Sequence, residues 1–260
     1  EGVSGTIILQ SFHAEPCPRP IHGCVESVRA WSEMHGHDHE LVGDEIADLL
    51  PSLYRERCHG RWPMMTDLAR LLLMRRHLGG GADRAVWIDA DVLVFAPTRF
   101  RVDDVTDHAV GREVWVSRDT KGRWRTRRHV HNAVLIFTAG SPALDFLIHA
   151  TQRVVEQLER PASPQIAGPK LLTTLHNLVR FPVLETAGML SPPVLADLVA
   201  GDGPRLRRHR QALQEPMAAA NLCHSLLGKM VDGVALDETL MCAASEVLRR
   251  EASETGLEPL

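Results

Sequence analysis

The chain has 260 residues, of which 44% are hydrophobic and 24% are charged. These proportions are typical of a globular protein with a sizeable core, and they exclude a disordered chain, a collagen-like repeat and a disulfide-rich miniprotein. Lys and Arg number 29 against 33 Asp and Glu, so the formal net charge of -4 gives no general attraction to nucleic acid. No apolar run is long enough to span a bilayer.

The five cysteines form no C-x-x-C pair, and their odd number favours a reducing compartment over a disulfide framework. We therefore expect a cytoplasmic protein, either free or peripheral to a membrane. The segment 13–24 holds four possible zinc ligands, which are His13, Cys17, His22 and Cys24. Because it contains three prolines and lacks paired ligand spacing, a loop is the favoured interpretation.

Apolar periodicity predicts strands that alternate with helices along the chain. The expected strands are Thr6–Phe12, His39–Val42, Ala85–Ile88 with its apolar continuation Val92–Phe95, and Asn132–Thr138. The expected helices are Cys24–Met34, Pro63–Leu78, a helix opened by Ser141 as N-cap and reaching Leu158, and one beginning at Gly168-Pro169. This alternation predicts one α/β domain over residues 1–260 with a mostly parallel sheet. Its core should span about 6–228, with an irregular C-terminal third and a helical tail at 229–260.

Two aspartates, Asp89 and Asp91, follow the buried strand that ends at Ile88. Ligands of such sheets bind beyond the carboxyl ends of the strands. In an extended backbone, residues two apart face the same side, so both carboxylates should address one ligand. Unpaired carboxylates are costly to bury, and Mg²⁺ or Mn²⁺ would compensate them. The alternative for this motif alone is a turn with two solvated aspartates.

Asp67 and Arg70 lie at positions i and i+3 of the preceding predicted helix, so they share one face. They form either a pair that grips one ligand or an intrahelical ion pair worth only a few tenths of a kcal/mol. The segments 63–70, 79–80 and 86–93 together resemble the sugar-binding region of D-x-D glycosyltransferases with the GT-A fold, a Rossmann-like nucleotide-sugar-binding domain.

The resemblance is closest to the capsular-polysaccharide and mannosyltransferase relatives grouped as family 32, and more distant to the clostridial glucosylating toxins. It spans roughly residues 6–228. Further matching segments are Glu26–Trp31, His37–His39, Gly43–Glu45, Asn132, Ser141-Pro142 and Gly168-Pro169 with Thr173.

The resemblance implies a metal-dependent hexosyltransferase that uses Mn²⁺ or Mg²⁺ and a UDP- or GDP-sugar. The acceptor would be a hydroxyl of a small molecule, a glycan or a lipid-linked sugar, and the anomeric configuration would be retained. By this resemblance Asp91 binds the metal directly, and Asp89 acts through water, through the ribose or as a second ligand. Asp67 and Arg70 would hold hydroxyls of the donor sugar. No side chain is nominated as general base, because the departing phosphate itself could take the acceptor proton.

Two further residues are candidates by the same resemblance. Asn132 would reach the donor sugar or the acceptor, although an Asn that opens a strand is as often a turn residue. His224 is the candidate third metal ligand, with a hydrogen-bonded structural histidine as the alternative. The Trp that the family commonly has a few residues later is absent, and Leu226-Leu227-Gly228 stands there.

Other clusters have a functional and a structural interpretation. His35, His37 and His39 alternate as a metal cluster would, but two of them match positions that are usually aromatic in the family, which favours packing. The basic runs are 121–128 and 205–210. Arg123, Arg125 and Arg127 should share one face of a hairpin strand, where they would either bind an acidic acceptor or, as we favour, lie in solvent. Trp124 among them could stack on a sugar ring or a base.

Three rival functions remain. A phosphatase of the haloacid-dehalogenase type also has a strand ending in D-x-D, but on its first strand, whereas some eighty residues precede this motif. A nucleotidyltransferase would show a Gly-rich basic loop near its start, which residues 2–5 do not supply. A protein that binds nucleotide sugars without turnover is the third possibility.

Overall fold

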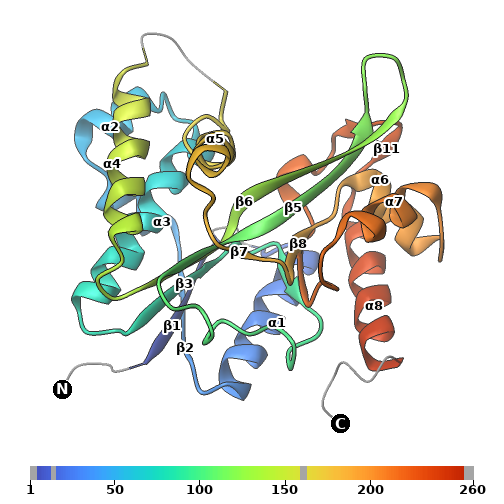
Figure 1. The fold of residues 1–260 in the computed structure, drawn as a ribbon, viewed down its shortest axis with the longest axis horizontal. Helices are drawn as coiled ribbons and strands as arrows, with labels where there is room; N and C mark the ends of the chain where they lie inside the picture. The colour runs from blue at the N-terminus through green and yellow to red at the C-terminus, as the bar shows by residue number, and fades with distance from the viewer. Residues whose placement is uncertain (1–4, 13–15, 159–162, 255–260) are drawn as a thin grey trace.

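The computed structural model describes residues 5–12, 16–158 and 163–254. Its largest sheet has six strands in the order β2-β1-β3-β6-β5-β7 (Figure 1). They are β1 Thr6–Ser11, β2 Asp38–Val42, β3 Arg84–Ile88, β5 His108–Arg118, β6 Trp124–Thr138 and β7 Val183–Leu184. β6 is antiparallel to its neighbours β3 and β5, and the other adjacent strands pair in parallel. Within the described sheet only β6 runs against the rest, which confirms the predicted α/β fold with a mostly parallel central sheet.

The remaining described strands form two smaller sheets. One contains β4 Val92–Val94, β8 Ala187–Met189 and β9 Ala219–Asn221 in the order β4-β9-β8, and the other pairs β10 Met230–Val231 with β11 Val234–Ala235. The run after Asp91 was expected to continue the preceding strand. Instead, β4 follows a turn and pairs with β9, which brings the region of Asn221 beside Asp91.

The helices form largely where proline and glycine mark their ends. They are α1 Arg19–Met34, α2 Ser52–Arg57, α3 Trp62–Gly79, α4 Pro142–Glu156, α5 Pro169–Val179, α6 Pro192–Val199, α7 Pro204–Ala212 and α8 Glu238–Glu254, with the short 3-10 helices η1 Asp44–Leu49 and η2 His224–Leu226. Proline occupies the first turn of α1, α3, α4, α5, α6 and α7, where its missing N–H costs nothing. Among the described residues, no helix is both long enough and apolar enough to cross a membrane.

Two helix boundaries differ from expectation. α1 begins at Arg19 rather than at Cys24, because Pro20 suits its first turn. The loop expected over 13–24 is therefore wrong from Arg19 onward, and His13 lies outside the described residues. Cys24 is buried in the core and Cys17 is exposed. α4 ends at Glu156, short of Leu158, and Ser141 occupies its N-cap without a capping hydrogen bond from its side chain.

The central sheet is buried on both faces. In β1, Ile8 belongs to one hydrophobic cluster, whereas Ile7 and Leu9 belong to another, as the alternation of a strand requires. The first cluster lies between the sheet and α1, α6 and α8. The second is formed with α2, α3, α4 and α5 (Figure 1). Two helical layers therefore hold the sheet rigidly and leave the ends of its strands for a site.

The C-terminal third is more regular than expected. α6, α7 and α8 lie together, and α8 also contacts α1 (Figure 1). Met241, Ala244 and Leu248 of α8 are buried in the same cluster as Ile8 of β1. The sequence concealed α6 and α7 because both are short and α7 is rich in arginine, with few apolar positions to show a helical period.

Candidate active site

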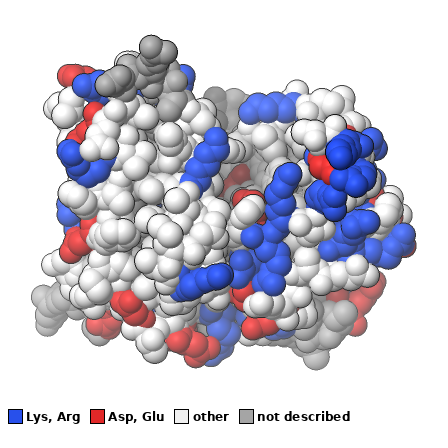
Figure 2. Space-filling model, turned by 45° about the horizontal axis from the view of Figure 1, so that its top comes forward, with Lys and Arg blue, Asp and Glu red and all other residues white. Residues whose placement is uncertain are grey.

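A cleft of about 970 Å³ opens beyond the carboxyl end of β3. Side chains from α3, α5, β5, β6 and the segment after β9 line it. On the face drawn in Figure 2, acidic side chains lie inside a hollow, and Lys and Arg side chains stand around its rim. The cleft brings together all the residues expected at the site, which are Asp67, Arg70, Asp89, Asp91, Asn132 and His224. Their individual roles stay predictions.

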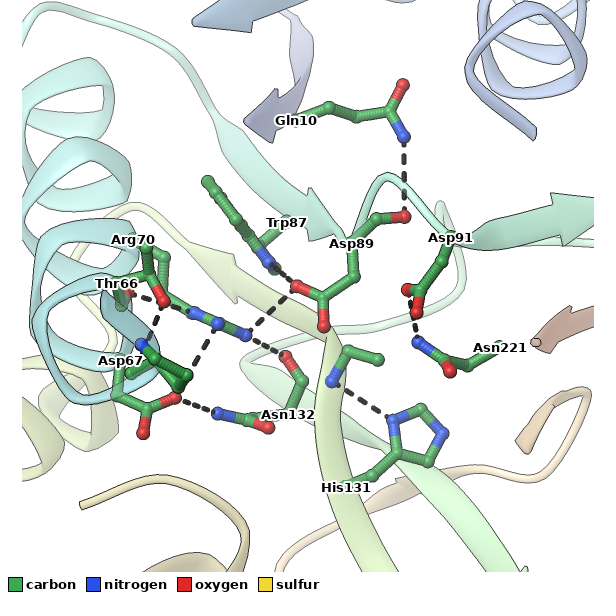
Figure 3. Close-up of polar contacts among 12 residues, drawn as sticks. Gln10, Thr66, Asp67, Arg70, Trp87, Asp89, Asp91, His131, Asn132 and Asn221 are labelled. Atoms are coloured by element: carbon green, nitrogen blue, oxygen red, sulfur yellow. Dashed lines mark hydrogen bonds and ion pairs between the residues drawn. The ribbon is translucent and has the colours of Figure 1, made fainter. Parts of the chain in front are cut away.

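The D-x-D motif forms a turn, not the extended segment that was expected. The Val92 N–H donates to the Asp89 carbonyl oxygen at 3.0 Å, which closes the turn. The Asp89 N–H donates to Ala133 of β6 at 2.8 Å, and the Asp91 carbonyl accepts from the Leu222 N–H at 2.9 Å. The turn is thus fixed to β6 and to the residue that follows β9. Both carboxylates still line the cleft, but they contact different partners (Figure 3).

Arg70 is the centre of the polar network on the α3 side (Figure 3). Its Nε donates to the Thr66 carbonyl at 3.1 Å, and its Nη1 donates to Asp89 Oδ1 at 3.1 Å and to the Asn132 carbonyl at 2.8 Å. Its Nη2 lies 3.5 Å from Asp67 Oδ1. The expected intrahelical ion pair is present, and Arg70 also bridges α3 to β3 and β6. Because its side chain is only 8% exposed, this bridge is a buried one.

Asp67 and Asp89 are both supported by neighbours. Asp67 Oδ1 accepts a hydrogen bond from Asn132 Nδ2 at 2.7 Å, and Asp89 Oδ1 accepts one from Trp87 Nε1 at 2.6 Å. Burial raises the pKa of Asp67 to about 7, although Arg70 and the hydrogen bond from Asn132 lower it. The Arg70 guanidinium contacts both carboxylates and is the cation that compensates their charge. It also lies 5.1 Å from the centre of the Trp87 ring.

Asp91 has a different environment. Its carboxylate accepts hydrogen bonds from Asn221 Nδ2 at 2.6 Å and from the His224 N–H at 2.8 Å, and both donors are neutral. Among the residues that the structure describes, no Lys or Arg forms an ion pair with it. Burial and the nearby Asp89 raise the pKa of Asp91 to about 7. Asp91 is thus a carboxylate that lacks a cation.

His224 lies in a strained segment that wraps around Asp91. Cys223 has a φ of 60°, which is uncommon for a residue with a Cβ, and its N–H donates to Asn221 Oδ1 at 2.7 Å. The His224 ring packs edge-on against Phe12, and burial lowers the pKa of the imidazole. Its Nε2 is buried and has no hydrogen-bond partner in the described part of the protein. A ligand that enters the cleft could satisfy this nitrogen.

Asn132 does not open a strand, as was expected, because β6 already begins at Trp124. It lies in a β-bulge, where the register with β5 shifts between Val110 and Gly111. His131 supports the bulge, since its Nδ1 accepts from the Ala133 N–H at 3.1 Å. A Cβ on Gly111 would lie 2.2 Å from the His131 ring, so only glycine leaves room for it. The bulge turns Asn132 toward Asp67 (Figure 3).

Sequence reasoning missed Glu113, a residue of β5 that lines the cleft. It pairs with His129 of β6 and follows the alternation of the strand, in which Val114 and Val116 are buried in the core. No hydrogen bond or ion pair of its carboxylate is found within the described residues, and burial raises its pKa to about 7. In the sequence, Glu113 could have been noticed as a glutamate that alternates with the buried apolar residues of its strand and so lies on the face away from the core.

Glu113 should make stability depend on pH. Its pKa of about 7 exceeds the ordinary 4.5, so the folded chain binds the proton more tightly, and stability is lost as pH rises through this window. The loss should reach up to about 2 to 3 kcal/mol. Glu113→Gln should reduce it, and Glu246→Gln, at an exposed position of α8, should not. Urea denaturation between about pH 4 and about pH 8 measures the difference, and equal pH dependence in Glu113→Gln and the parent would contradict the assignment.

The basic runs have partners within the protein. Arg123 and Arg125 both donate to Asp119 Oδ2, at 3.2 and 3.0 Å, and their side chains are more than half exposed. The guanidinium groups of Arg118 and Arg205 lie 5.0 and 5.6 Å from the centre of the Trp124 ring. Arg123 and Arg125 therefore fit the expected solvated surface. The Trp124 ring already contacts two arginines, so it is not free to stack on a sugar ring or a base.

Neither a family model nor a curated protein matches this chain. Solved structures do. The bifunctional glycosyltransferase WbbM in its apo form has a TM-score of 0.50 at 11% identity, covering 97% of this chain and 52% of that one. A glycosyltransferase involved in glycosylation of the major capsid of PBCV-1 has a TM-score of 0.47 at 12% identity, covering 94% and 98%. The galactosyltransferase LgtC in complex with donor and acceptor sugar analogues has a TM-score of 0.44 at 16% identity, and the match covers 92% of this chain and 95% of that one.

At these identities the likeness concerns the fold alone. The chain spans about half the length of WbbM. The expected membership of family 32 gains no support, because no family model matches. The D-x-D motif follows β3, the third strand among the described residues, and this departs from the first-strand position expected for the phosphatase alternative.

Proposed function

We propose that this protein transfers a sugar from a nucleoside diphosphate sugar to an acceptor hydroxyl, with a divalent cation bound at Asp91. One observation carries the proposal: Arg70 compensates Asp89, whereas the donors to Asp91 in the same cleft are, within the described parts of the chain, all neutral. A cation that arrives with a diphosphate would supply the missing charge. The likeness of the fold to that of a glycosyltransferase supports the same function.

The residues present fit Mn²⁺ or Mg²⁺. Asp91 offers a carboxylate without a cation, and His224 offers a buried Nε2 without a partner. The ligand atoms of Asp89, Asp91 and His224 do not all lie within 4.8 Å of one another. Phosphate oxygens and water would therefore complete the coordination of the ion. The bound ion would stabilise the negative charge that develops on the departing diphosphate.

Asp67 and Asn132 are proposed to hold the donor sugar. Asp67 Oδ2 makes no hydrogen bond among the described residues, and the Asn132 side-chain carbonyl is likewise free to accept one. Sugar hydroxyls are suitable donors to both oxygens. Arg70 differs from expectation, because most of its donors already serve the Thr66 and Asn132 carbonyls and Asp89. We therefore assign Arg70 to positioning the carboxylates rather than to a direct contact with the sugar.

Glu113 and His129, which line the same cleft from β5 and β6, are proposed to face the acceptor. The Glu113 carboxylate can accept a hydrogen bond from the acceptor hydroxyl and orient it. In the transfer, the bond from the anomeric carbon to the diphosphate oxygen breaks and the bond to the acceptor oxygen forms. The acceptor oxygen attacks from the face that the diphosphate leaves, which would give the retention expected from the family resemblance, and the acceptor proton passes to an oxygen of the departing diphosphate.

A thermal-shift experiment with UDP- and GDP-sugars tests the proposal. With Mn²⁺ present, one of the donors should raise the melting temperature, and without metal the rise should disappear. Slow hydrolysis of that donor without acceptor should accompany the binding. Stabilisation without hydrolysis would favour a binding protein without turnover, and no metal-dependent shift with any donor would contradict the proposal.

A further inference from the structure

A second group of metal-ligating side chains lies at the other end of the sheet. His35 caps the C-terminus of α1, His37 directly precedes β2, and Asp103 follows β4 in sequence. The cleft opens where the strands end, whereas β2 begins at Asp38 beside this group. The three residues therefore join two segments that are far apart in sequence, away from Asp89 and Asp91.

The geometry of the group is that of a potential coordination site. One ligand atom from each of His35, His37 and Asp103 lies within 4.8 Å of the others, and no other such group is found among the described residues. The two imidazole rings are stacked with centres 5.8 Å apart and planes inclined by 19°. His37 Nε2 is 3.8 Å from Asp103 Oδ2. An ion between these atoms would need only a small inward movement of the side chains.

His37 supplies an independent indication of a missing ligand. Its side chain is 6% exposed, and its Nε2, directed at Asp103, is buried without a hydrogen-bond partner. A buried polar atom without a partner is rare in proteins and costly. Packing alone, the interpretation favoured from sequence, explains why the ring contacts Trp31 at 5.5 Å between centres. It does not explain the unsatisfied nitrogen.

His35 has the support that metal-binding histidines usually have. Its Nε2 lies 3.0 Å from the Pro97 carbonyl oxygen, so Nε2 carries the proton and Nδ1 keeps the lone pair. This hydrogen bond fixes the tautomer and the orientation of the ring. His39, the third histidine of the run, is not part of the group, because its Nε2 contacts Gln10 Oε1 at 2.9 Å.

The charges around the group leave one carboxylate oxygen for an ion. Arg84 Nη1 contacts Asp103 Oδ1 at 3.3 Å, while Asp103 Oδ2 faces His37. The other end of the Arg84 guanidinium is engaged, since Nη2 donates to the Asp103 and Val105 carbonyls. Arg101 is the further positive group near His37. Arg84 orients the carboxylate. Neutral imidazoles with one carboxylate suit Zn²⁺ better than Mg²⁺ or Ca²⁺.

We propose that His35, His37 and Asp103 form a second metal site, which binds one Zn²⁺-like transition-metal ion with water in the remaining position. The ion would tie the junction of α1 and β2 to the segment that follows β4. The proposal does not depend on the proposed function, because the two sites share no residue.

Co²⁺, which replaces Zn²⁺ and absorbs visible light in a tetrahedral site, is the probe. Titration of the full chain with Co²⁺ should give visible absorption that saturates at one equivalent and is lost on addition of Zn²⁺. His37→Ala should abolish the absorption and weaken Zn²⁺ binding by at least about tenfold. His39→Ala, in the same histidine run, and Asp91→Asn, in the cleft, should leave both unchanged.

A second variant keeps the test valid if His37→Ala fails to fold. The Asp103 side chain is 42% exposed, so Asp103→Asn should fold and should also lose the absorption. The proposal is overturned if the parent protein gives no tetrahedral Co²⁺ spectrum. It is also overturned if His37→Ala or Asp103→Asn binds Zn²⁺ as tightly as the parent.

Discussion

Asp91→Asn should abolish the metal-dependent stabilisation by a nucleotide sugar and lower the rate of transfer at least about 100-fold. The substitution removes the carboxylate that has no cation of its own but keeps the size of the side chain. The melting temperature of the protein without ligand should change little, because the amide removes a buried charge but can accept only one of the two hydrogen bonds that Asn221 and His224 donate, and the two effects oppose each other. Thermal shift with and without Mn²⁺, together with a donor-hydrolysis assay, measures both effects.

The matched control for this prediction is Asp104→Asn, which alters an exposed aspartate between β4 and β5. It should behave like the parent protein in both assays. If Asp91→Asn kept the metal-dependent shift, Asp91 would not be the metal ligand. If it lost the shift but also lost its folded structure by circular dichroism, the assignment would be tested with Asp91→Glu, which should restore metal binding in part.

Arg70→Met should destabilise the protein by about 3 to 5 kcal/mol, because it leaves Asp67 and Asp89 without their buried cation. In a chain of this size this corresponds to a fall in melting temperature of roughly 6 to 20 °C. The guanidinium holds α3, β3 and β6 together, so the loss concerns the frame of the site as well as its charge. Urea denaturation gives the difference in the free energy of unfolding.

A second substitution shows how much of the lost stability comes from the unpaired charge of Asp67 and how much from the lost contacts of Arg70. Arg70→Met combined with Asp67→Asn should recover a large part of the lost stability, because the unpaired carboxylate on α3 is then gone. Arg75→Met, on an exposed position of the same helix, should change stability by less than about 0.5 kcal/mol. A double variant as unstable as Arg70→Met alone would show that Asp67 is not the charge that Arg70 compensates.

Local patterns predicted much of the fold. α3 and β3 were expected nearly at their observed bounds, because proline opens the helix, glycines follow it, and four apolar residues mark the strand. The same signals misplaced the start of α1, where Pro20 marks the first turn. α6 and α7 are too short to show a clear helical period, and α7 is also rich in arginine with few apolar positions. Most of the stability of such short helices comes from tertiary packing.

The sequence predicted which residues line one cleft, but not the contacts that they make. The D-x-D motif and its helix are local in sequence, so the sequence predicted that they share a site. The hydrogen bond from Asn221 to Asp91 joins residues 130 positions apart, and no local pattern reveals it. The turn at Asp89 and the bulge at Asn132 are likewise set by the strands that pair around them. Glu113 could be assigned to the cleft only once the β5–β6 hairpin was seen to line it.

Anomalous diffraction at the manganese edge, from crystals soaked with Mn²⁺ and UDP or GDP, shows whether Asp91 binds the metal. We expect one anomalous peak in the cleft, at about 2.2 Å from a carboxylate oxygen of Asp91, with diphosphate oxygens on its other side. A structure with bound nucleotide in which no metal contacts Asp91, and in which its carboxylate keeps only Asn221 and His224 as partners, would contradict it.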